Sequence, residues 1–231
     1  MKSFTFKQFE IQQSKDVFRV GTDGVLLGAL ADVETASRVL EVGTGTGLIS
    51  LMLAQRNSDA FFLGLDINKE AVLLTRTNFE NAPFSTRLEI KHQDFKTFIT
   101  EEKFDLVVSN PPYFEESDSG KDKIARQTVE LNFSQLIANS ARLLSEKGVF
   151  SVIIPVAAGE VFISMAKENC LFLNRRINII GIENSKVKRL ILEFSLTGKM
   201  FEESAFIIEK SPRQYSDQYL ELTKEFHVFK G

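Results

Sequence analysis

The sequence predicts an α/β fold in which a mostly parallel sheet is flanked by helices. Val39, Leu40 and Val42, and the continuous apolar run at 61–65, are typical of buried parallel strands, and the segment between them has the spacing of a helix. Three alternate glycines, Gly43, Gly45 and Gly47, join the first strand to that helix. Because ligands of open parallel sheets bind along the edge formed by the carboxyl ends of the strands, we expect a ligand site at this turn.

Length and composition limit the possibilities. With 231 residues, of which 43% are hydrophobic, the chain is long enough for one well-buried core and short for two. We expect a single domain over 1–231, with an N-terminal extension at 1–37 and a core at 38–231. The net charge of -3 and the pI of about 5.6 provide no global positive field, so a nucleic acid would have to be held by a local patch.

Several classes of protein are disfavoured by residues that the chain lacks. Its one cysteine, Cys170, excludes an intrachain disulfide and a multi-thiolate metal site, and we expect it to have a packing role. The two histidines, His92 and His227, have no ligand-spaced partners, so we expect no metal. The charged N-terminus does not resemble a signal peptide, and no apolar run reaches membrane-spanning length. We therefore expect a cytoplasmic protein, by default a monomer.

The N-terminal extension is predicted to hold small strands and one helix. Apolar residues alternate with polar ones at 4–6 and 9–11, which favours short strands or a hairpin, and 17–20 is a further short apolar segment. A turn at 21–24 is followed by a short helix at 25–31, which leads the chain to the first core strand.

The spacing of the glycine loop indicates which cofactor it could hold. The dinucleotide pattern G-x-G-x-x-G fails because Leu48 stands at its last position, and the Gly-Lys-Ser/Thr of a phosphate-binding P-loop is absent. Glu41 lies two positions before the first glycine. This acid-x-Gly-x-Gly-x-Gly pattern resembles the first motif of the class I S-adenosylmethionine (SAM) methyltransferases. The resemblance implies a Rossmann-like fold and SAM as cofactor, with S-adenosylhomocysteine as product; the alternative is a glycine turn without a ligand.

Acidic residues end the next two predicted strands. Asp66 ends the run at 61–65, about twenty residues beyond the loop, where an acid can accept both ribose hydroxyls of a nucleoside. It could equally cap the helix predicted at 68–81. The strand at 88–91 is followed by Asp94 on the same edge of the sheet.

The rest of the chain completes a mixed seven-stranded sheet with an antiparallel edge hairpin at its C-terminal side. The predicted elements are a fourth strand at 104–109, helix 133–144, turn 145–148, strand 149–154, helix 157–168, hairpin strands 171–182 and 189–196 around a turn at 183–188, a possible strand at 206–208 and a helix at 215–226. The polar stretch 114–130 is expected to be a mobile loop, either one that closes over a substrate or one that is merely solvated.

The fourth strand delivers Asn110-Pro111-Pro112-Tyr113, which suits a planar amine. The two prolines stiffen the backbone and remove two N–H donors. The side-chain oxygen of Asn110 and the carbonyl of Pro111 can each accept one N–H, while the ring of Tyr113 or Phe114 stacks on the base. No strong base is needed, because the N–H becomes acidic only as the C–N bond forms. A turn that merely ends a strand could also have this sequence.

This tetrapeptide after the fourth strand resembles the amino-group methyltransferases that act on adenine N6, guanine N2 or the glutamine amide of release factors. Three further segments, at 18–29, 125–128 and 215–226, resemble the bacterial valine-tRNA adenine-N6 methyltransferase family. That family modifies the adenine at position 37, beside the anticodon. The open alternatives are release-factor glutamine methylation, methylation of adenine or guanine in ribosomal RNA, and a SAM- or RNA-binding module without catalysis.

The resemblance assigns roles to individual residues. Glu41 and the glycines would line the methionine end of SAM, Asp66 would hold the ribose, and Asp94 would accept the adenine amino group. In full, it implies a cofactor site made of Thr22, Asp23, Glu41, Gly43, Thr44, Gly45, Gly47, Asp66, Asp94 and Phe95, and a target site made of Asn110, Pro111 and Tyr113 with Pro112 and Phe114 beside them.

A tRNA anticodon stem-loop would also need cations for its phosphates. The candidates are Lys2, Lys7, Lys15 and Arg19 near the start, Arg126 in the polar stretch, and Arg175, Arg176, Lys186, Lys188 and Arg189 on the late hairpin. Each of these alone could be an ordinary surface charge, so only their convergence on the Asn110 side of the sheet would make a footprint.

Overall fold

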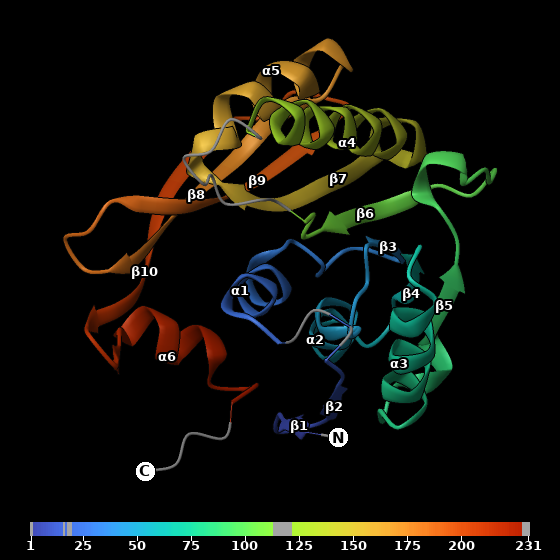
Figure 1. Ribbon diagram of the computed structural model, residues 1–231, viewed down its shortest axis with the longest axis vertical. Coiled ribbons are helices and arrows are strands. Elements are labelled where there is room, and N and C mark those ends of the chain that lie inside the picture. The colour runs from blue at the N-terminus through green and yellow to red at the C-terminus, as the bar shows by residue number, and fades with distance from the viewer. Residues whose placement is uncertain (1, 16, 18–19, 113–121, 228–231) are drawn as a thin grey trace.

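A nine-stranded sheet forms the centre of the protein (Figure 1). The computed structural model describes residues 2–15, 17, 20–112 and 122–227, with the backbone alone described for residue 2 and residues 122–132. The strand order is β11-β10-β8-β9-β7-β6-β3-β4-β5. The strands are β3 (Arg38–Val42), β4 (Phe61–Asp66), β5 (Leu88–His92), β6 (Phe104–Ser109), β7 (Leu144–Pro155), β8 (Phe172–Ile182), β9 (Val187–Ser195), β10 (Glu202–Ser211) and β11 (Gln214–Tyr215).

Strands β3, β4, β5, β6 and β7 are parallel, so their carboxyl ends meet at one edge of the sheet. β9 is antiparallel to β7 and to β8, which confirms the predicted hairpin. β10 then adds to β8 in the parallel sense, and β11 pairs with β10. The predicted seven-stranded core is thus extended by two strands, and the hairpin does not lie at the edge of the sheet.

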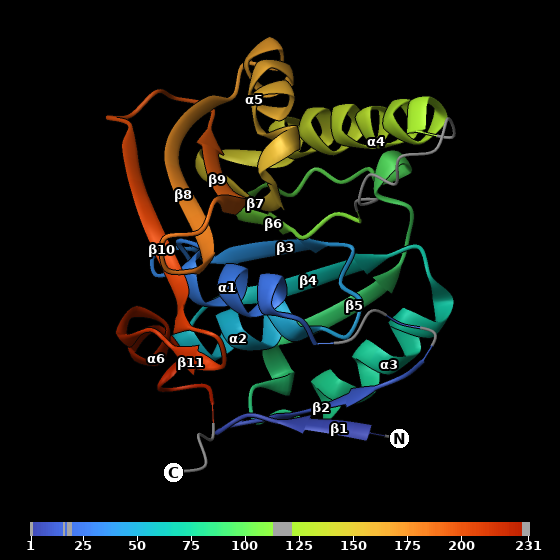
Figure 2. The ribbon, with the colours of Figure 1, turned by 60° about the vertical axis from the view of Figure 1, so that its left-hand side comes forward.

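Helices cover both faces of the sheet (Figure 2). On one face lie α1 (Thr22–Leu30), α2 (Leu48–Arg56) and α3 (Lys69–Glu80), and on the other lie α4 (Asp122–Leu143) and α5 (Gly159–Glu168). Because side chains alternate along a strand, Val39 packs into the first apolar cluster and Leu40 into the second. The short helix α6 (Asp217–Thr223) and the one-turn helices η1 (Ser85–Arg87), η2 (Phe95–Thr97) and η3 (Val156–Ala158) complete the fold.

The two ends of the described chain pack together. β1 (Lys2–Thr5) and β2 (Glu10–Gln13) form the expected antiparallel hairpin. The amide N–H of Lys7 donates to the carbonyl of Phe226 at 2.8 Å, and Phe6 forms a β-bridge with His227. The N-terminal hairpin is therefore a fixed part of the fold.

Helix α1 begins at Thr22, three residues before the predicted start. The sequence interpretation treated Gly21 and Gly24 as a turn, but Gly24 lies inside the helix. A Cβ added at Gly24 would lie 2.9 Å from a side-chain carbon of Leu48 in α2, and one at Gly28 would lie 2.9 Å from Cβ of Met52. These glycines allow two helices to approach closely, which is a tertiary requirement that the local pattern does not reveal.

Helix α4 begins at Asp122, within the stretch 114–130 that was expected to be a loop. The prediction rested on polar composition, which a solvated helix shares with a loop. Residues 113–121 lie outside the described part of the chain, so any closing motion of this stretch stays a prediction.

Two smaller expectations also change. The predicted turn at 145–148 is absorbed into β7 as an irregularity, where a Cβ on Gly148 would lie 2.7 Å from the carbonyl oxygen of Phe104. Cys170, expected to pack inside, is exposed at the end of α5 with a φ of 59°. Among the described helices, none combines the length and apolar character that crossing a membrane requires.

Candidate active site

The glycine loop leaves β3 in a backbone conformation that favours glycine. Gly43, Gly45 and Gly47 have φ values of 74°, 60° and 82°. A Cβ at Gly43 or Gly45 would meet nothing within 4 Å, whereas one at Gly47 would lie 2.6 Å from the ring of Phe79. The first two glycines therefore face open space where a ligand can lie against the backbone, and the third is required by packing.

Residues far along the chain fix the shape of this loop. The N–H of Gly43 donates to the carbonyl of Leu65 at the end of β4 (2.9 Å). From α3, the hydroxyl of Thr75 donates to the carbonyl of Gly45 (2.8 Å), and the amide of Asn78 donates to the carbonyl of Thr46 (2.8 Å). The loop is thus held in place before any ligand binds. Sequence reasoning missed Thr75 and Asn78, and no signal around them would have identified their role.

Glu41 is buried beneath the loop, with 1% of its surface exposed. Its carboxylate accepts hydrogen bonds from the N–H of Ser50 (3.0 Å) and from the Ser50 hydroxyl. Burial raises the pKa of Glu41 to about 8, while the bonds from Ser50 oppose the shift and the nearby carboxylate of Asp66 adds to it. In this structure Glu41 therefore ties the end of β3 to the first turns of α2.

Asp66 and Asp94 lie at neighbouring strand tips, as predicted. Asp66 accepts from the N–H of Gly45 and from that of Asn68, both at 2.8 Å. Since a carboxylate has about four acceptor positions, it retains the capacity to accept further hydrogen bonds from a ligand. The cap of α3 is Asn68 and not Asp66. Asp94 caps η2 by accepting from the N–H of Lys96 (2.9 Å).

The tips of β4 and β5 are joined directly. The N–H of Gln93 donates to the carbonyl of Asp66 at 3.0 Å, which holds the segment carrying Asp94 beside the segment carrying Asp66. The side chains of Thr44 and Phe95, two of the predicted cofactor residues, are buried. Hydrogen bonds therefore link the glycine loop to the tip of β4, and that tip to the segment that leads into η2.

The Asn-Pro-Pro segment lies beside the glycine loop. β3 and β6 are neighbouring parallel strands in which Val42 pairs with Ser109. The Ser109 hydroxyl also donates to the carbonyl of Val42 at 2.9 Å. Gly43 directly follows β3 and Asn110 directly follows β6, so the two motifs leave the sheet side by side. Ser109 was not predicted to contribute.

The described part of the target motif is short. Asn110 is half-buried, Pro111 is buried and Pro112 is exposed. Tyr113 and Phe114 lie outside the described residues, as does the side chain of Arg126, whose backbone belongs to α4.

Comparison with known proteins agrees with this geometry. The family model described as methyltransferase small domain matches residues 13–167. A curated protein of Flavobacteriaceae bacterium (strain 3519-10), named tRNA1(Val) (adenine(37)-N6)-methyltransferase, is 53% identical over 99% of this chain and 100% of its own length. The chain belongs to the tRNA1(Val) (adenine(37)-N6)-methyltransferase family. A further relative with the same name, from Aliivibrio fischeri, is 40% identical over 98% of both chains.

Solved structures share the methyltransferase fold at low sequence identity. A predicted O-methyltransferase from Agrobacterium tumefaciens has a TM-score of 0.71 at 18% identity, covering 88% of this chain and 96% of its own. A methyltransferase from Pyrococcus furiosus has a TM-score of 0.64 at 16% identity, covering 82% and 90%. The Rossmann-like fold expected from the glycine loop is therefore confirmed.

The remaining predicted cofactor residues, Thr22 and Asp23, lie at the start of α1. Thr22 is exposed, and Asp23 is half-buried and forms an ion pair with Arg189 of β9, with 3.0 Å between Oδ2 and Nε. The structure thus joins a residue predicted for the cofactor to one predicted for the RNA. Among the described residues, no cluster of His, Cys, Asp or Glu could hold a metal ion.

Arg175 and Arg176, which were predicted to contact RNA phosphates, do not form one patch. As consecutive residues of β8 they point to opposite faces of the sheet. Arg175 pairs with the buried Glu193 at 3.0 Å, while Arg176 contacts Glu160 at 3.5 Å and Glu203 at 3.4 Å. Lys188 is exposed.

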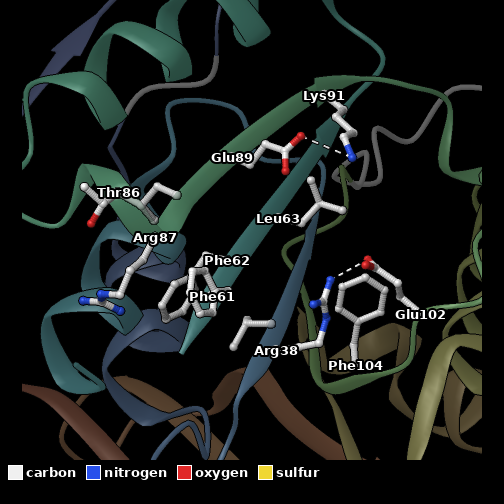
Figure 3. A pocket seen from close by; sticks show the side chains of 12 residues that line it. Arg38, Phe61, Phe62, Leu63, Thr86, Arg87, Glu89, Lys91, Glu102 and Phe104 are labelled. Carbon is white, nitrogen blue, oxygen red and sulfur yellow. Dashed lines mark hydrogen bonds and ion pairs between the residues drawn. The ribbon is translucent and has the colours of Figure 1, made fainter. Parts of the chain in front are cut away.

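One cavity in the methyltransferase fold lies away from this site (Figure 3). It has a volume of about 290 Å³ and is lined by the first residues of four strands, Arg38, Phe61, Leu88 and Phe104. Those residues mark the amino ends of β3, β4, β5 and β6, whereas the glycine loop and Asn110 follow the carboxyl ends. The ion pairs Arg38–Glu102 and Glu89–Lys91 line its wall.

Proposed function

We propose that this protein transfers the methyl group of SAM to the exocyclic N6 of an adenine in tRNA, at position 37 of tRNA1(Val). The observation that carries this proposal is the pairing of Val42 with Ser109, because it sets a glycine cradle and an amine-accepting motif at adjacent positions of one edge. The names of the full-length relatives support the substrate.

The residues at this edge fit SAM. The open space at Gly43 and Gly45 leaves room for the ligand against bare backbone, and the remaining acceptor capacity of Asp66 suits the ribose hydroxyls. Asp94, Phe95, Thr44, Thr22 and Asp23 would complete the pocket. When bound, SAM supplies an electrophilic methyl group on a sulfonium.

The side chains of the target motif would hold the adenine amine. Asn110 accepts one N–H through Oδ1, and the Pro111 carbonyl accepts the other. Both bonds draw the amine out of conjugation with the ring, so that its lone pair can point at the methyl donor. Since neither group is a strong base, the proton leaves to water only after the nitrogen has gained its new bond. Stacking by Tyr113 or Phe114 stays a prediction.

An adenine in an anticodon loop can reach this motif more easily than one in a duplex, because less stacking and pairing is lost when it turns outward. Exposed Lys188 and, from α4, Arg126 are the proposed phosphate contacts. We further propose that the protein acts as a monomeric single domain in the cytoplasm, the compartment of its substrate. Size-exclusion chromatography with light scattering would test the monomer.

The experiment is transfer of tritiated methyl groups from SAM to total tRNA, ribosomal RNA and release factor, followed by nucleoside and amino-acid analysis. We expect N6-methyladenosine in tRNA and no label elsewhere. Label in ribosomal RNA or in glutamine would contradict the proposal, and SAM binding without transfer to any acceptor would favour a binding module.

A further inference from the structure

Helix α1 lies between the cofactor side of the fold and the late hairpin. On one side, Gly24 and Gly28 bring it against Leu48 and Met52 of α2. On the other side it packs against the sheet at β7, the neighbour of β9 (Figure 1). Leu48 is the residue that follows the glycine loop, so the position of α1 affects the wall of the cradle.

The carboxyl end of α1 is held by a partly buried network around Glu193. The guanidinium of Arg175 donates to the carbonyl of Leu30 at 3.0 Å and pairs with Glu193 at 3.0 Å. Glu193 also accepts from the N–H of Asp32 at 3.2 Å and from the hydroxyl of Ser151 at 3.2 Å. Burial raises the pKa of Glu193, and the positive charge of Arg175 opposes that shift. This network holds α1 from the side of β8, β9 and β7.

An ion pair from the same face of β9 contacts the amino end of α1. Residues 189 and 193 are four apart along the strand, so Arg189 and Glu193 point to the same side. Nε of Arg189 lies 3.0 Å from Oδ2 of Asp23, and the two side chains are 22% and 23% exposed. Gly21, which precedes the helix, supplies no side-chain cap. Asp23 in the first turn is favoured by the helix dipole, and Arg189 anchors that carboxylate to the sheet.

We infer that Arg189 is a positioning residue for the SAM-binding part of the site, around the glycine loop, and not a phosphate contact. By holding Asp23, it keeps the first turn of α1, including Gly24, against Leu48 beside the glycine loop. This inference rests on the proposed use of SAM, but it is independent of which acceptor receives the methyl group. The Arg175 network and the Arg189 pair together hold α1 at both ends, and the second is at the end that carries Gly24, which packs against Leu48.

The test is the affinity for SAM, measured by isothermal titration calorimetry without RNA. Arg189→Gln should weaken SAM binding by about tenfold. Asp23→Asn, which also changes a residue proposed to line the cofactor pocket, should weaken it at least as much. The double variant should be no weaker than Asp23→Asn, because Arg189 acts on the cofactor through Asp23. Arg189→Lys keeps the charge and should restore most of the affinity. The matched control is Arg176→Gln on the opposite face of the hairpin, which should leave the affinity for SAM unchanged.

Urea unfolding of the same variants separates positioning from folding. All five variants should unfold cooperatively like the wild type, with SAM affinity as the property that differs among them. Unchanged SAM affinity in Arg189→Gln, or additive losses in the double variant, would overturn the inference. So would a reduced salt slope of tRNA binding in Arg189→Gln at normal SAM affinity, since that pattern identifies a phosphate contact. Failure of methyl transfer to tRNA would contradict the proposed substrate and leave the calorimetric result intact.

Discussion

The glycine loop at 43–47 is held by contacts from α3 and β4, whereas the Asn-Pro-Pro segment at 110–112 is stiffened by its two prolines. The loop donates a hydrogen bond to the end of β4 and accepts two from α3, and it has a buried carboxylate beneath it. In the described part of the chain, the second segment has two prolines and follows Ser109, whose hydroxyl donates to β3. Changes to the loop should therefore alter folding and cofactor affinity, and changes to Asn110 should alter the rate.

The largest effect is expected from Gly47→Ala. The new Cβ would meet the ring of Phe79 at 2.6 Å, and the residue would have to keep a φ of 82°. Strain and overpacking together should lower the free energy of unfolding by about 3–5 kcal/mol. Urea unfolding measures this, with Gly181→Ala as control, because a Cβ there meets nothing within 4 Å. Equal stability of the two variants would show that packing does not fix the loop.

Asn110→Ala should impair methyl transfer at the Asn-Pro-Pro segment (the target half of the site) without changing SAM binding at the glycine loop (the cofactor half). Loss of one acceptor for the amine should raise the barrier to methyl transfer by about 2–4 kcal/mol. Single-turnover rates give the barrier, and calorimetry gives the affinity for SAM, which should stay near the wild-type value. If SAM binding were lost as well, the proposed division between the two halves would be wrong.

Glu41→Gln should change how stability depends on pH. The folded protein has a Glu41 pKa of about 8, and the unfolded chain has the ordinary value of 4.5. Between pH 6 and pH 8 the folded state therefore retains a proton that the unfolded state has released, and the free energy of unfolding falls as pH rises. The wild type should lose about 2 kcal/mol relative to Glu41→Gln over this interval, and little more above pH 9.

Urea unfolding of the cofactor-free proteins at several pH values measures that difference. Glutamine keeps an acceptor for Ser50, so the variant should remain folded and serve as the non-titrating reference for the wild type. Parallel pH profiles of the two proteins would mean that Glu41 does not titrate in this range. The comparison is specific to the cofactor half, because Asn110, Pro111 and Pro112 contain no titrating group.

Local patterns predicted the elements that carry the chemistry. A buried strand, alternate glycines and a helix have recognisable spacing, and the same is true of Asn-Pro-Pro after β6. The rule that parallel strands end at one edge was sufficient to expect Gly43 and Asn110 together. Their adjacency depends on the register of β3 and β6, which only the structure provides.

The errors came from residues whose role depends on the tertiary structure. Gly24 was interpreted as part of a turn, although it allows α1 to approach α2. The polar sequence 122–130 was interpreted as a loop, although its backbone is helical. Arg175 was one of the candidate phosphate contacts, and the sequence gives its charge but not the buried Glu193 with which it pairs. In each case the missing information was the neighbour, which lies far away in sequence.

The central claim, that SAM and the target amine meet at adjacent strand tips, can be tested by a crystal structure with S-adenosylhomocysteine. An amine in hydrogen-bond contact with Asn110 and in position to attack the methyl group requires the cofactor sulfur to lie within about 8 Å of Asn110 Oδ1. We expect the sulfur within that distance, with the homocysteine along Gly43 and Gly45. A sulfur farther from Asn110, or a ligand bound at the amino ends of the strands, would contradict the account.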